Sequence, residues 1–578
     1  MTLIGALSNA ASALRTTHSA LGALSNNVSN VNTPGYARKA PLLAARSFGP
    51  GTGGGVDIAA VTRLADRYLQ AEADRSTAAL AYAQTFGKFA GSIDAILGRP
   101  ADGQDLGSLL AKLRDALLAA TSVPSDASRK RDVVTAADRF ARAVRDLSAR
   151  MAGVRGEAQQ EIERAVAGAN AAAQRVAELN KTIATGFGLG QDVGLLQDQR
   201  ARDVETLVDL VGARAIDCPD GSVELLIGAG GILVDAVAHE LGVSAEGVPD
   251  AAVLLDDQDI TAKLATGRIG ALLAVRDGLT VDTLDYLDAL SLALIGRLNA
   301  AYADAASAVG RTAIDGSAAF ASGDTFAFTG TIRFMTVDTA GRVVSTYDCT
   351  GGAAETLAAF SSRFRLDNAE ARVVDGRLHL ETTDPNRRLA LAWAVVEPGT
   401  VATAADTDKS LVNFLGLNDF LIGTNASNLS VRDYLAAQPE LLATAPASQA
   451  AIEVGIGAQA FAPGDPTTLK HLVAVLEAPV DLTIARNGQS AARRASFVGH
   501  AANIVGDLAM SIGDAADKAN QAAALNDVLR SRLSGVSGVN IDQEMAELTQ
   551  YQNAYNAAAR LLSVVNDMLH ELEQAVVR

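Results

Sequence analysis

Three acidic residues, Asp375, Glu381 and Asp384, could supply paired carboxylates for general acid and base chemistry. Facing each other across a cleft, two such groups could hydrolyse a glycosidic bond, as in a peptidoglycan hydrolase. Acidic residues in strands and turns are most often only solvated surface groups. We therefore predict that the protein is not an enzyme. The alternative is a cell-wall hydrolase whose active site lies in the region around these residues, 306–490. An activity assay on this part of the chain would distinguish the two.

Other residue types that bind metals or cofactors lack the spacing that such sites need. The two cysteines, Cys218 and Cys349, form neither a disulfide framework nor a metal knuckle. The six histidines contain no HxxxH or HExxH pair. The glycines at 228–231 resemble part of a dinucleotide loop, but a strand-like run follows them where a helix is required, which favours a hairpin turn. The glycines at 49–55 precede no GK[ST] and are interpreted as a flexible linker. We predict no catalytic, cofactor-binding or metal-binding residues.

The charge of the chain excludes some partners. Its formal net charge is −17, and its pI is about 4.9. A protein that binds the phosphate backbone or an anionic membrane needs a basic surface, so neither partner is expected. No run of 18 apolar residues predicts a membrane span. Residues 1–13 lack the basic start of a secretory signal, so we expect export without a cleaved signal peptide.

Heptad periodicity marks both ends of the chain. Near the N-terminus, one row of apolar residues repeats every seven positions: Leu7, Leu14, Leu21 and Val28. A companion row lies three or four positions away: Leu3, Ala10, Thr17, Leu24 and Val31. Near the C-terminus the two rows are Ile541, Leu548, Tyr555, Leu562, Leu569 and Val576, and Tyr551, Ala558, Val565 and Leu572. Matching seams predict that the terminal helices pair as a coiled coil and form one discontinuous domain.

The apolar residues between the termini follow two different patterns. Apolar residues spaced four and three apart from Val133 to Ile183 predict a long helix in a bundle. Short alternating runs broken by Gly and Asp predict a separate α+β insert. We therefore expect a mainly α fold with a β-containing insert and nested, discontinuous domains. They are a terminal coiled-coil domain (1–45 and 536–578), a long helical domain with β-hairpins (46–305 and 491–535) and an α+β outer module (306–490).

A turn motif ends the first helix. Residues 25–36 are dense in Asn, Ser and Thr and close with Pro34-Gly35, which predicts that the helix stops near Asn30. The side chains that we expect to satisfy backbone groups at the helix end are Asn26, Asn27, Asn30 and Thr33. Tyr36 and Arg38 are expected to reach a neighbour. The motif could alternatively be a helix terminator alone.

The motif SNNVSNVNTPGYAR at residues 25–38 resembles the N-terminal motif of bacterial flagellar rod, hook and hook-associated proteins. Residues 537–558 look like the matching C-terminus of that axial family. Three inner segments narrow the resemblance to the hook-associated members. Gly54-Gly55-Val56 leading to Val61 and Arg63 is similar to the entry of the family's second domain, residues 194–200 are similar to a Leu-Asp-Gln-Arg segment, and residues 267–299 form the third. In this chain the Asp is Asp198, one Gln after the Leu pair, so the register is slightly altered.

The resemblance implies a structural protein that forms a ring between hook and filament and is exported by the flagellar type III apparatus. It also implies terminal helices that fold on assembly, an extracellular location on the flagellum, hook protein and a second hook-associated protein as axial neighbours, and an export chaperone at the C-terminal helix. Another axial protein, hook or distal rod, is the nearest alternative. The assembly interface is assigned to Leu7, Leu14, Leu21, Val28, Asn26, Asn27, Asn30, Thr33, Pro34, Gly35, Tyr36, Arg38, Ile541, Leu548, Tyr551, Tyr555, Leu562, Val565, Leu569 and Leu572.

Overall fold

Contacts within the chain divide it into two compact units in this computed structural model. The first unit comprises residues 1–89, 156–276 and 513–578, and the second comprises 90–155 and 277–512. The structure describes residues 3–33, 36–47, 53–64, 66–97, 103–245, 247–248, 250–303, 305–306, 310–393, 401–402, 409–462, 464–486 and 489–576. The predicted mainly α fold with β-containing parts is confirmed. The division into three nested domains stays a prediction.

Helices make up most of the first unit. Those lying wholly inside it are α1 (Leu3–Ser29), α5 (Gly194–Val211), the one-turn 3₁₀ helix η2 (Thr261–Lys263), α6 (Gly267–Leu273) and α14 (Ile541–Val576). Three longer helices contribute part of their length to each unit: α2 (Arg67–Leu97), α4 (Ala127–Gly188) and α13 (Phe497–Ser537). No helix in the described ranges is long and apolar enough to cross a membrane.

The periodicity of the long central helix is confirmed. Helix α4 runs for 62 residues without a proline. Its predicted apolar row is buried throughout: Val133, Ala137, Phe140, Val144, Leu147, Met151, Val154 and Ala158. A continuous stripe at this spacing lets a helix pack along one side while its charged side chains remain solvated.

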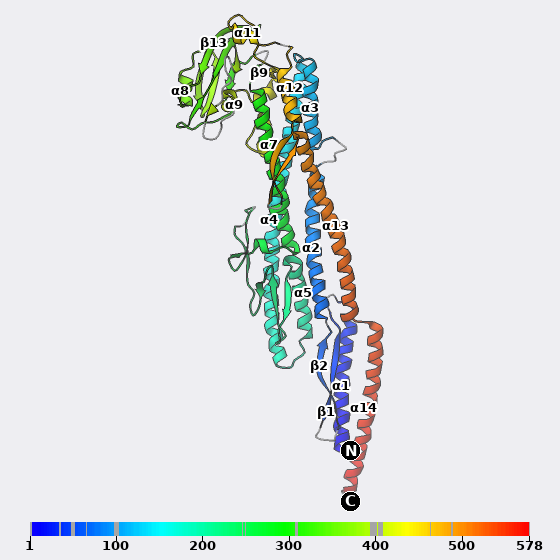
Figure 1. Ribbon diagram of the computed structural model, residues 1–578. Coiled ribbons are helices and arrows are strands. Elements are labelled where there is room, and N and C mark those ends of the chain that lie inside the picture. The colour runs from blue at the N-terminus through cyan, green and yellow to red at the C-terminus, as the bar shows by residue number, and fades with distance from the viewer. Residues whose placement is uncertain are drawn as a thin grey trace. The chain divides into compact units, whose positions relative to one another are not determined.

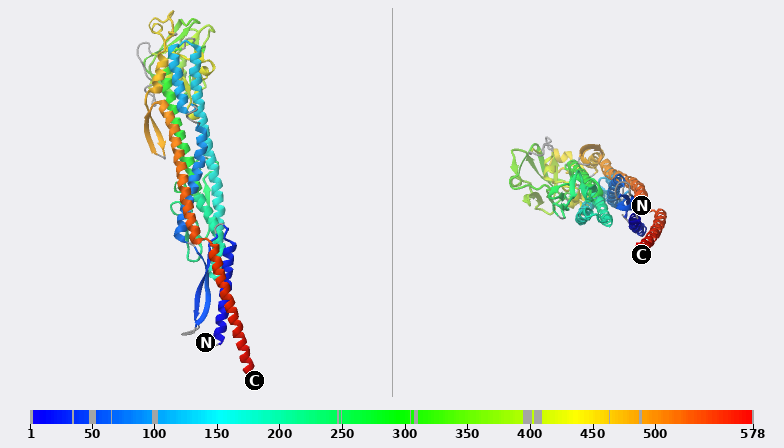
Figure 2. Two further views of the ribbon diagram at one scale, coloured as in Figure 1. Left: turned by 90° about the vertical axis from the view of Figure 1, so that its right-hand side faces the viewer. Right: turned by 90° about the horizontal axis from the view of Figure 1, so that it is seen from below.

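The chain after α1 forms a long antiparallel hairpin of β1 (Lys39–Ser47) and β2 (Gly53–Arg63) beside α1 (Figure 2). The prediction of a flexible linker at residues 49–55 was therefore wrong for Gly53–Gly55, which belong to a strand. The hydroxyls of Ser12 and Thr16 donate to the Val56 carbonyl, the latter over 2.7 Å. A Cβ on Gly55, whose φ is +91°, would lie 2.9 Å from the Ser12 Oγ, so glycine permits this approach.

Two small antiparallel sheets complete the first unit. One contains β3 (Arg214–Asp217), β4 (Val223–Ile227) and β5 (Gly231–Val234), and the other contains β6 (Leu241–Val243), β7 (Val253–Leu255) and β8 (Gln258–Asp259). Strands β4 and β5 pair through a tight turn in which Gly228 and Gly230 have positive φ. The prediction of a hairpin at these glycines is therefore confirmed.

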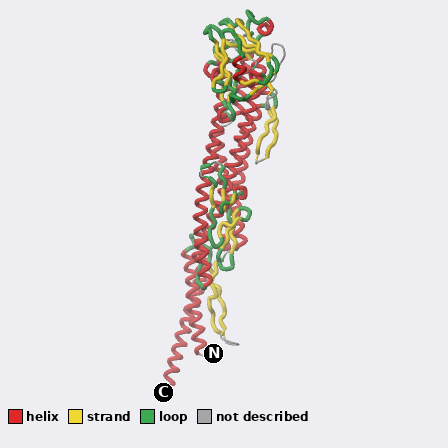
Figure 3. Tube along the Cα trace, turned by 90° about the vertical axis from the view of Figure 1, so that its left-hand side faces the viewer, coloured by secondary structure: helices red, strands yellow, loops and turns green. Residues whose placement is uncertain are grey.

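The second unit combines helices with antiparallel strands, which gather in one part of it (Figure 3). Its helical elements are α3 (Leu106–Ser122), η3 (Ala274–Leu279, a π-helical turn that is divided equally between the two units), α7 (Thr280–Tyr302), α8 (Leu357–Ser362), α9 (Leu411–Leu415), η4 (Ala426–Asn428), α10 (Asp433–Ala437), η5 (Pro439–Leu441), α11 (Gln449–Glu453) and α12 (Thr467–Glu477). Helices α3 and α7 both contact α12.

The strands of the second unit form several short antiparallel sheets. They are β9 (Ala305–Ala306), β10 (Ala313–Asp315), β11 (Thr325–Phe328), β12 (Thr331–Val337), β13 (Val343–Thr350), β14 (Glu355–Thr356), β15 (Ala369–Val374), β16 (Arg377–Thr382), β17 (Arg388–Trp393), β18 (Val401–Ala402), β19 (Leu421–Ile422), β20 (Ser430–Val431), β21 (Ala445–Pro446), β22 (Val480–Arg486) and β23 (Gln489–Ala495). Leucines and phenylalanines make up most of their core, where Phe334 is fully buried and its ring meets that of Phe364 edge-on at 5.1 Å.

We expect Phe334→Ala to lower the unfolding free energy of the second unit by about 3–5 kcal/mol, because it leaves a cavity and removes the aromatic contact. Calorimetric unfolding of the full chain measures this loss. Val373→Ala on the exposed strand β15 is the control and should cost less than about 1 kcal/mol. Equal effects of the two substitutions would contradict this core assignment.

Candidate assembly site at the paired termini

The terminal helices α1 and α14 lie side by side, with both chain ends at the same end of the pair (Figure 1). The predicted contact between them is confirmed, and the two helices run antiparallel. The side chains buried along α1 include Ala10, Thr17 and Leu24, and those along α14 include Ala558 and Val565. These are members of the two companion rows, so the companion rows form the centre of the contact.

The other predicted row is less covered. Its α1 members Leu7, Leu14, Leu21 and Val28 are half-buried, as are its α14 members Leu548, Leu562 and Leu569. Tyr551 of the α14 companion row is also half-buried. Three predicted α14 residues are exposed: Ile541 at 49%, Tyr555 at 39% and Leu572 at 55%. As members of a seam within the chain these three were wrongly predicted, because a single partner helix covers only one side of α14. Their place in an interface between subunits stays a prediction.

A buried asparagine ties the turn motif to both helices. Asn27 has no exposed surface, and its amide makes four hydrogen bonds. Its Nδ2 donates to the Lys39 carbonyl and to Oε2 of Glu544, each over 2.9 Å. Its Oδ1 accepts from the Tyr36 hydroxyl over 2.8 Å and from the Lys39 N–H over 3.0 Å. Every hydrogen-bonding position of the amide is therefore used.

The buried carboxylate of Glu544 is the second centre of this network. The Nε of Arg38 donates to Oε1 of Glu544 over 2.5 Å, and its Nη2 donates to Glu547 over 2.7 Å. Burial lowers the pKa of Arg38, but its hydrogen bonds to the two glutamates outweigh burial and raise it. The Arg38 N–H also donates to the Ser537 carbonyl. One arginine thus joins the turn motif to the start of α14 and the end of α13.

Glu544 is the functional residue that the sequence prediction missed. It lies seven residues before Tyr551, so it continues the companion row of α14 by one heptad. A search for apolar residues passes over it because it is charged. Extending the row backwards would have placed a glutamate in the seam, where a buried charge requires a partner.

The remaining polar residues of the motif act locally. The Asn30 side chain donates to the Asn26 carbonyl over 2.9 Å, and the Thr33 hydroxyl donates to Oδ1 of Asn30 over 3.2 Å. Of the four side chains expected to satisfy backbone groups at the end of α1, Asn30 does so, whereas Thr33 binds the Asn30 side chain and Asn27 binds the backbone of Lys39. Pro34 and Gly35 lie outside the described residues. Tyr36 and Arg38, expected to reach a neighbour, bind partners within their own chain.

The segment at 194–200 meets the turn motif from helix α5. Asp198 is buried, and its Oδ1 accepts from Nε of Arg63 over 3.1 Å. Burial raises the pKa of Asp198, while Arg63 and Lys39 oppose the rise. Burial, followed by the charges of Asp198 and Glu544, raises the pKa of Tyr36 to about 12. Tyr36 therefore remains a neutral hydrogen-bond donor at any physiological pH.

Arg200 anchors the same helix to the first small sheet. Its Nη1 donates to Oδ1 of Asn180 over 2.9 Å and to the Gly221 carbonyl over 2.8 Å. The Asn180 side chain in turn exchanges hydrogen bonds with the backbone of Val223. The arrangement holds α4, α5 and strand β4 together, so the role of Arg200 in this structure is positional.

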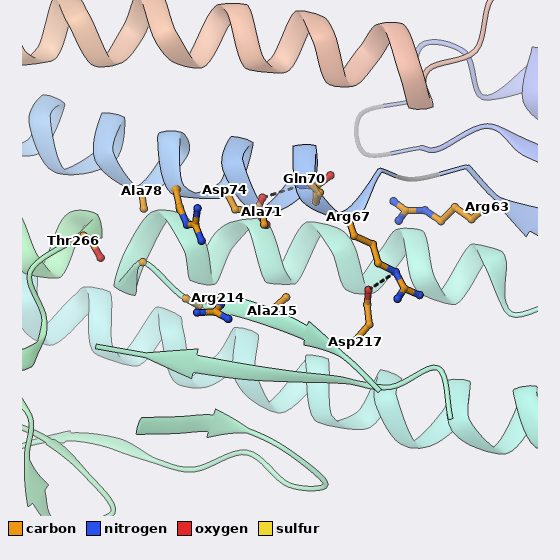
Figure 4. A pocket seen from close by; sticks show the side chains of 13 residues that line it. Arg63, Arg67, Gln70, Ala71, Asp74, Ala78, Arg214, Ala215, Asp217 and Thr266 are labelled. Atoms are coloured by element: carbon orange, nitrogen blue, oxygen red, sulfur yellow. Dashed lines mark hydrogen bonds and ion pairs between the residues drawn. The ribbon is translucent and has the colours of Figure 1, made fainter. Parts of the chain in front are cut away.

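A hollow of about 440 Å³ adjoins the site, lined by residues of the turn motif, α2, α5 and the end of α13. Asp74 lines this hollow and a neighbouring pocket, in which Arg67 pairs with Asp217 (Figure 4). Burial raises the pKa of Asp74 to about 6, and Glu205 adds to the rise. The Gln70 amide and the nearby Arg530 act in the opposite direction.

The chemistry of this site is packing and hydrogen bonding. Within the described ranges, no group of three or more His, Cys, Asp or Glu side chains could hold a metal ion. The polar groups of the network instead bind one another across four segments of the chain. Such an arrangement fixes the relative positions of α1, the turn and α14.

Three family models match the chain. Residues 90–315 match the helical domain of flagellar hook-associated protein FlgK. Residues 7–36 match the flagella basal body rod protein, and residues 534–575 match the C-terminal part of the flagellar basal body rod FlgEFG protein. The two terminal matches contain Asn27, Tyr36 and Glu544. The residues of this site therefore lie in the two segments that are similar to flagellar axial proteins.

The chain is 23% identical over 604 residues to flagellar hook-associated protein 1 of Salmonella typhimurium, covering 98% of the chain and 99% of that protein. The identity and both coverages are the same for hook-associated protein 1 of Salmonella typhi. The resemblance to flagellar hook-associated protein 1 is thereby confirmed. A solved structure of the flagellar hook junction protein FlgK from Burkholderia pseudomallei is also similar, at 13% identity and a TM-score of 0.48, covering 82% of this chain and all of that one.

We expect Glu544→Ala to lower the unfolding free energy of the first unit by about 3 kcal/mol, since it leaves Arg38 and the Asn27 amide without their buried partner. Amide hydrogen exchange should also accelerate in residues 36–39 and at the start of α14. Glu571→Ala, at an exposed position of the same helix, should change stability by less than about 0.5 kcal/mol. Unchanged exchange in E544A would show that the network does not hold the turn.

Asp74 should make the stability of the first unit depend on pH. Because its pKa rises from 3.8 to about 6 on folding, the stability from its protonation is complete below about pH 4 and is lost as the pH rises through 6. Asp74→Asn should therefore raise the unfolding free energy by about 1–3 kcal/mol at pH 7 and have no effect near pH 4. Thermal unfolding across this range tests the expectation, with the exposed Glu72→Gln as control. An equal gain in the unfolding free energy of the Asp74→Asn variant at pH 4 and at pH 7 would contradict this expectation.

Proposed function

We propose that the protein is a structural junction component of the bacterial flagellum, assembled as a ring between hook and filament through its paired terminal helices. The observation that carries the proposal is the buried network of Asn27, Arg38 and Glu544, which joins the end of α1 to the start of α14. The relatives named hook-associated protein 1 and the match of residues 90–315 support the junction position over another axial protein. The two terminal matches are to rod proteins and do not distinguish among axial proteins.

Helix α14 leaves a second apolar surface uncovered within the chain. Four exposed large side chains share one side of its C-terminal half at spacings of three and four residues: Leu561, Val564, Met568 and Leu572. Ile541, Met545 and Tyr555 are exposed on the opposite side of the helix. Exposed apolar surface of this extent on one helix indicates a binding face. In a ring or tube, terminal helices of neighbouring subunits would cover it. Each fully buried side chain of this kind would contribute about 1.5–3 kcal/mol to assembly.

The terminal pair is expected to fold together with assembly. Ordering its residues costs about 1–2 kcal/mol of backbone entropy each, and the covered side of α14 buries few large side chains to offset this. Neighbouring subunits would supply the remaining stabilisation. Limited proteolysis and circular dichroism of monomer and assembled ring test this step: a monomer whose residues 1–30 and 541–578 already resist protease would contradict it.

The proposed partners follow from the resemblance and from the exposed face of α14. Hook protein and a second hook-associated protein would be the axial neighbours. Before assembly, an export chaperone would cover the same apolar face and keep the subunit soluble during type III export, without a cleaved signal peptide. The proposed location is therefore extracellular, on the flagellum.

No observation favours the alternative of a cell-wall hydrolase. Glu381 is paired with Arg372, and Asp384 with Arg387. Asp375 occupies an exposed hairpin turn with a φ of +49°. Each of the three acidic residues thus has a structural explanation, and we propose a structural and not a catalytic role for this part of the chain.

We expect Val564→Asn to reduce motility and the number of attached filaments, because it puts an amide at the centre of the exposed apolar face. The purified variant should keep the circular dichroism and melting temperature of the parent chain, since Val564 is 52% exposed. Ser563→Asn, at the adjacent exposed position, is the matched control and should leave filaments attached. Filament subunits shed into the medium with hooks intact would support a junction defect; normal filaments in the V564N strain would contradict the proposed interface.

A further inference from the structure

A cleft of about 350 Å³ lies in the second unit, far along the sequence from the paired termini. One wall is the sheet formed by β10, β16 and β15, and the other is the segment that leads into α10. Its volume is in the range of pockets that hold small molecules, and its lining is mostly charged. Nothing in the proposed junction role uses it.

Arg311 is held rigidly at this cleft. Its Nη2 donates to the Leu417 carbonyl and to Oδ1 of Asn418, each over 3.1 Å. Its guanidinium lies 4.2 Å from the ring centre of Tyr434, close enough for a cation–π contact. All these partners are uncharged, so the positive charge is positioned without a carboxylate in contact.

Two further arginines line the cleft. Arg432 donates from Nη2 to the Asp315 carbonyl over 2.5 Å, and Arg377 is exposed at the start of β16. In the parts of the chain that the structure describes, neither of them nor Arg311 forms an ion pair. The buried Asp419 lies near enough to Arg311 and Arg432 for their charges to lower its pKa, against the stronger effect of burial, which raises it. Three guanidinium groups around one cleft favour an anionic ligand, since Arg binds carboxylates through paired hydrogen bonds.

Hydrogen-bond acceptors share the same cleft. Asp375 and Asp433 are exposed in its lining, and Oδ1 of Asp315 accepts a hydrogen bond from Nδ1 of His379 over 2.6 Å. These carboxylates would repel a ligand with several negative charges, such as an oligonucleotide or a polyphosphate. They suit a ligand that offers hydroxyl donors beside a single negative group.

We propose that this cleft binds a sugar acid of the uronate type. Its carboxylate would bind Arg377 and Arg432, and its hydroxyls would donate to Asp375 and Asp433. The ring of Tyr434 would border the sugar. A neutral sugar would leave the guanidinium groups without an anion, and a simple carboxylate such as acetate would leave the aspartates without donors.

Titration calorimetry of the full chain with D-glucuronate tests the proposal, with D-glucose and acetate as comparison ligands. Glucuronate should bind at least about tenfold more tightly than either, because only it satisfies both sets of groups. Arg377→Gln should weaken glucuronate binding about tenfold and leave the melting temperature unchanged, since Arg377 makes no contact that the fold needs. Arg372→Gln, an exposed arginine of β15 outside the cleft, should bind like the parent chain.

Three results would overturn the proposal: no glucuronate binding at millimolar concentration, equal binding of acetate or glucose, or equal loss in the R377Q and R372Q variants. These outcomes are independent of the junction role, because filament attachment is not among the readouts.

Discussion

A buried carboxylate must have a partner, and in this protein that requirement joins segments from opposite ends of the chain. Glu544 has no exposed surface, so its charge is stable only while Arg38 and Asn27 bind it. Asn27 and Glu544 are 517 residues apart in sequence. The hydrogen bonds to Asn27 also set the position of Tyr36 and of the first residue of β1. The terminal helices, the turn motif and the hairpin therefore depend on one polar cluster.

The same cluster explains how this chain can fix the register of its terminal helices although few large side chains are buried between them. The contact between α1 and α14 is lined by Ala10, Thr17, Ala558 and Val565 and is narrow, with Leu24 its largest buried side chain on α1. Small residues let the helix axes approach closely, but they bury little area and specify register weakly. A fully hydrogen-bonded buried network specifies register because any shift would leave a charge unpaired.

Ion pairs hold elements of the fold together in both units. In the first unit the half-buried Arg63 pairs with Asp198, and in the second Arg333 pairs with Asp348. Arg311 differs from these arginines because its partners are uncharged and it borders an open cleft, which leaves its charge available to a ligand. Paired arginines thus have structural roles in both units, whereas the arginines that line this cleft suit recognition.

The sequence by itself determined the helices, because a helix is built from hydrogen bonds between residues four apart and its apolar stripe can be read over a few turns. Helix α4, the end of α1 near Asn30 and the hairpin at Gly228 were predicted in this way. The tertiary structure alone decided that β1 and β2 pair, that Ile541 faces away from α1, and that Glu544 occupies the seam. These features rest on partners distant in sequence, and no local pattern of residues reports the partner that a strand edge or a buried charge will meet.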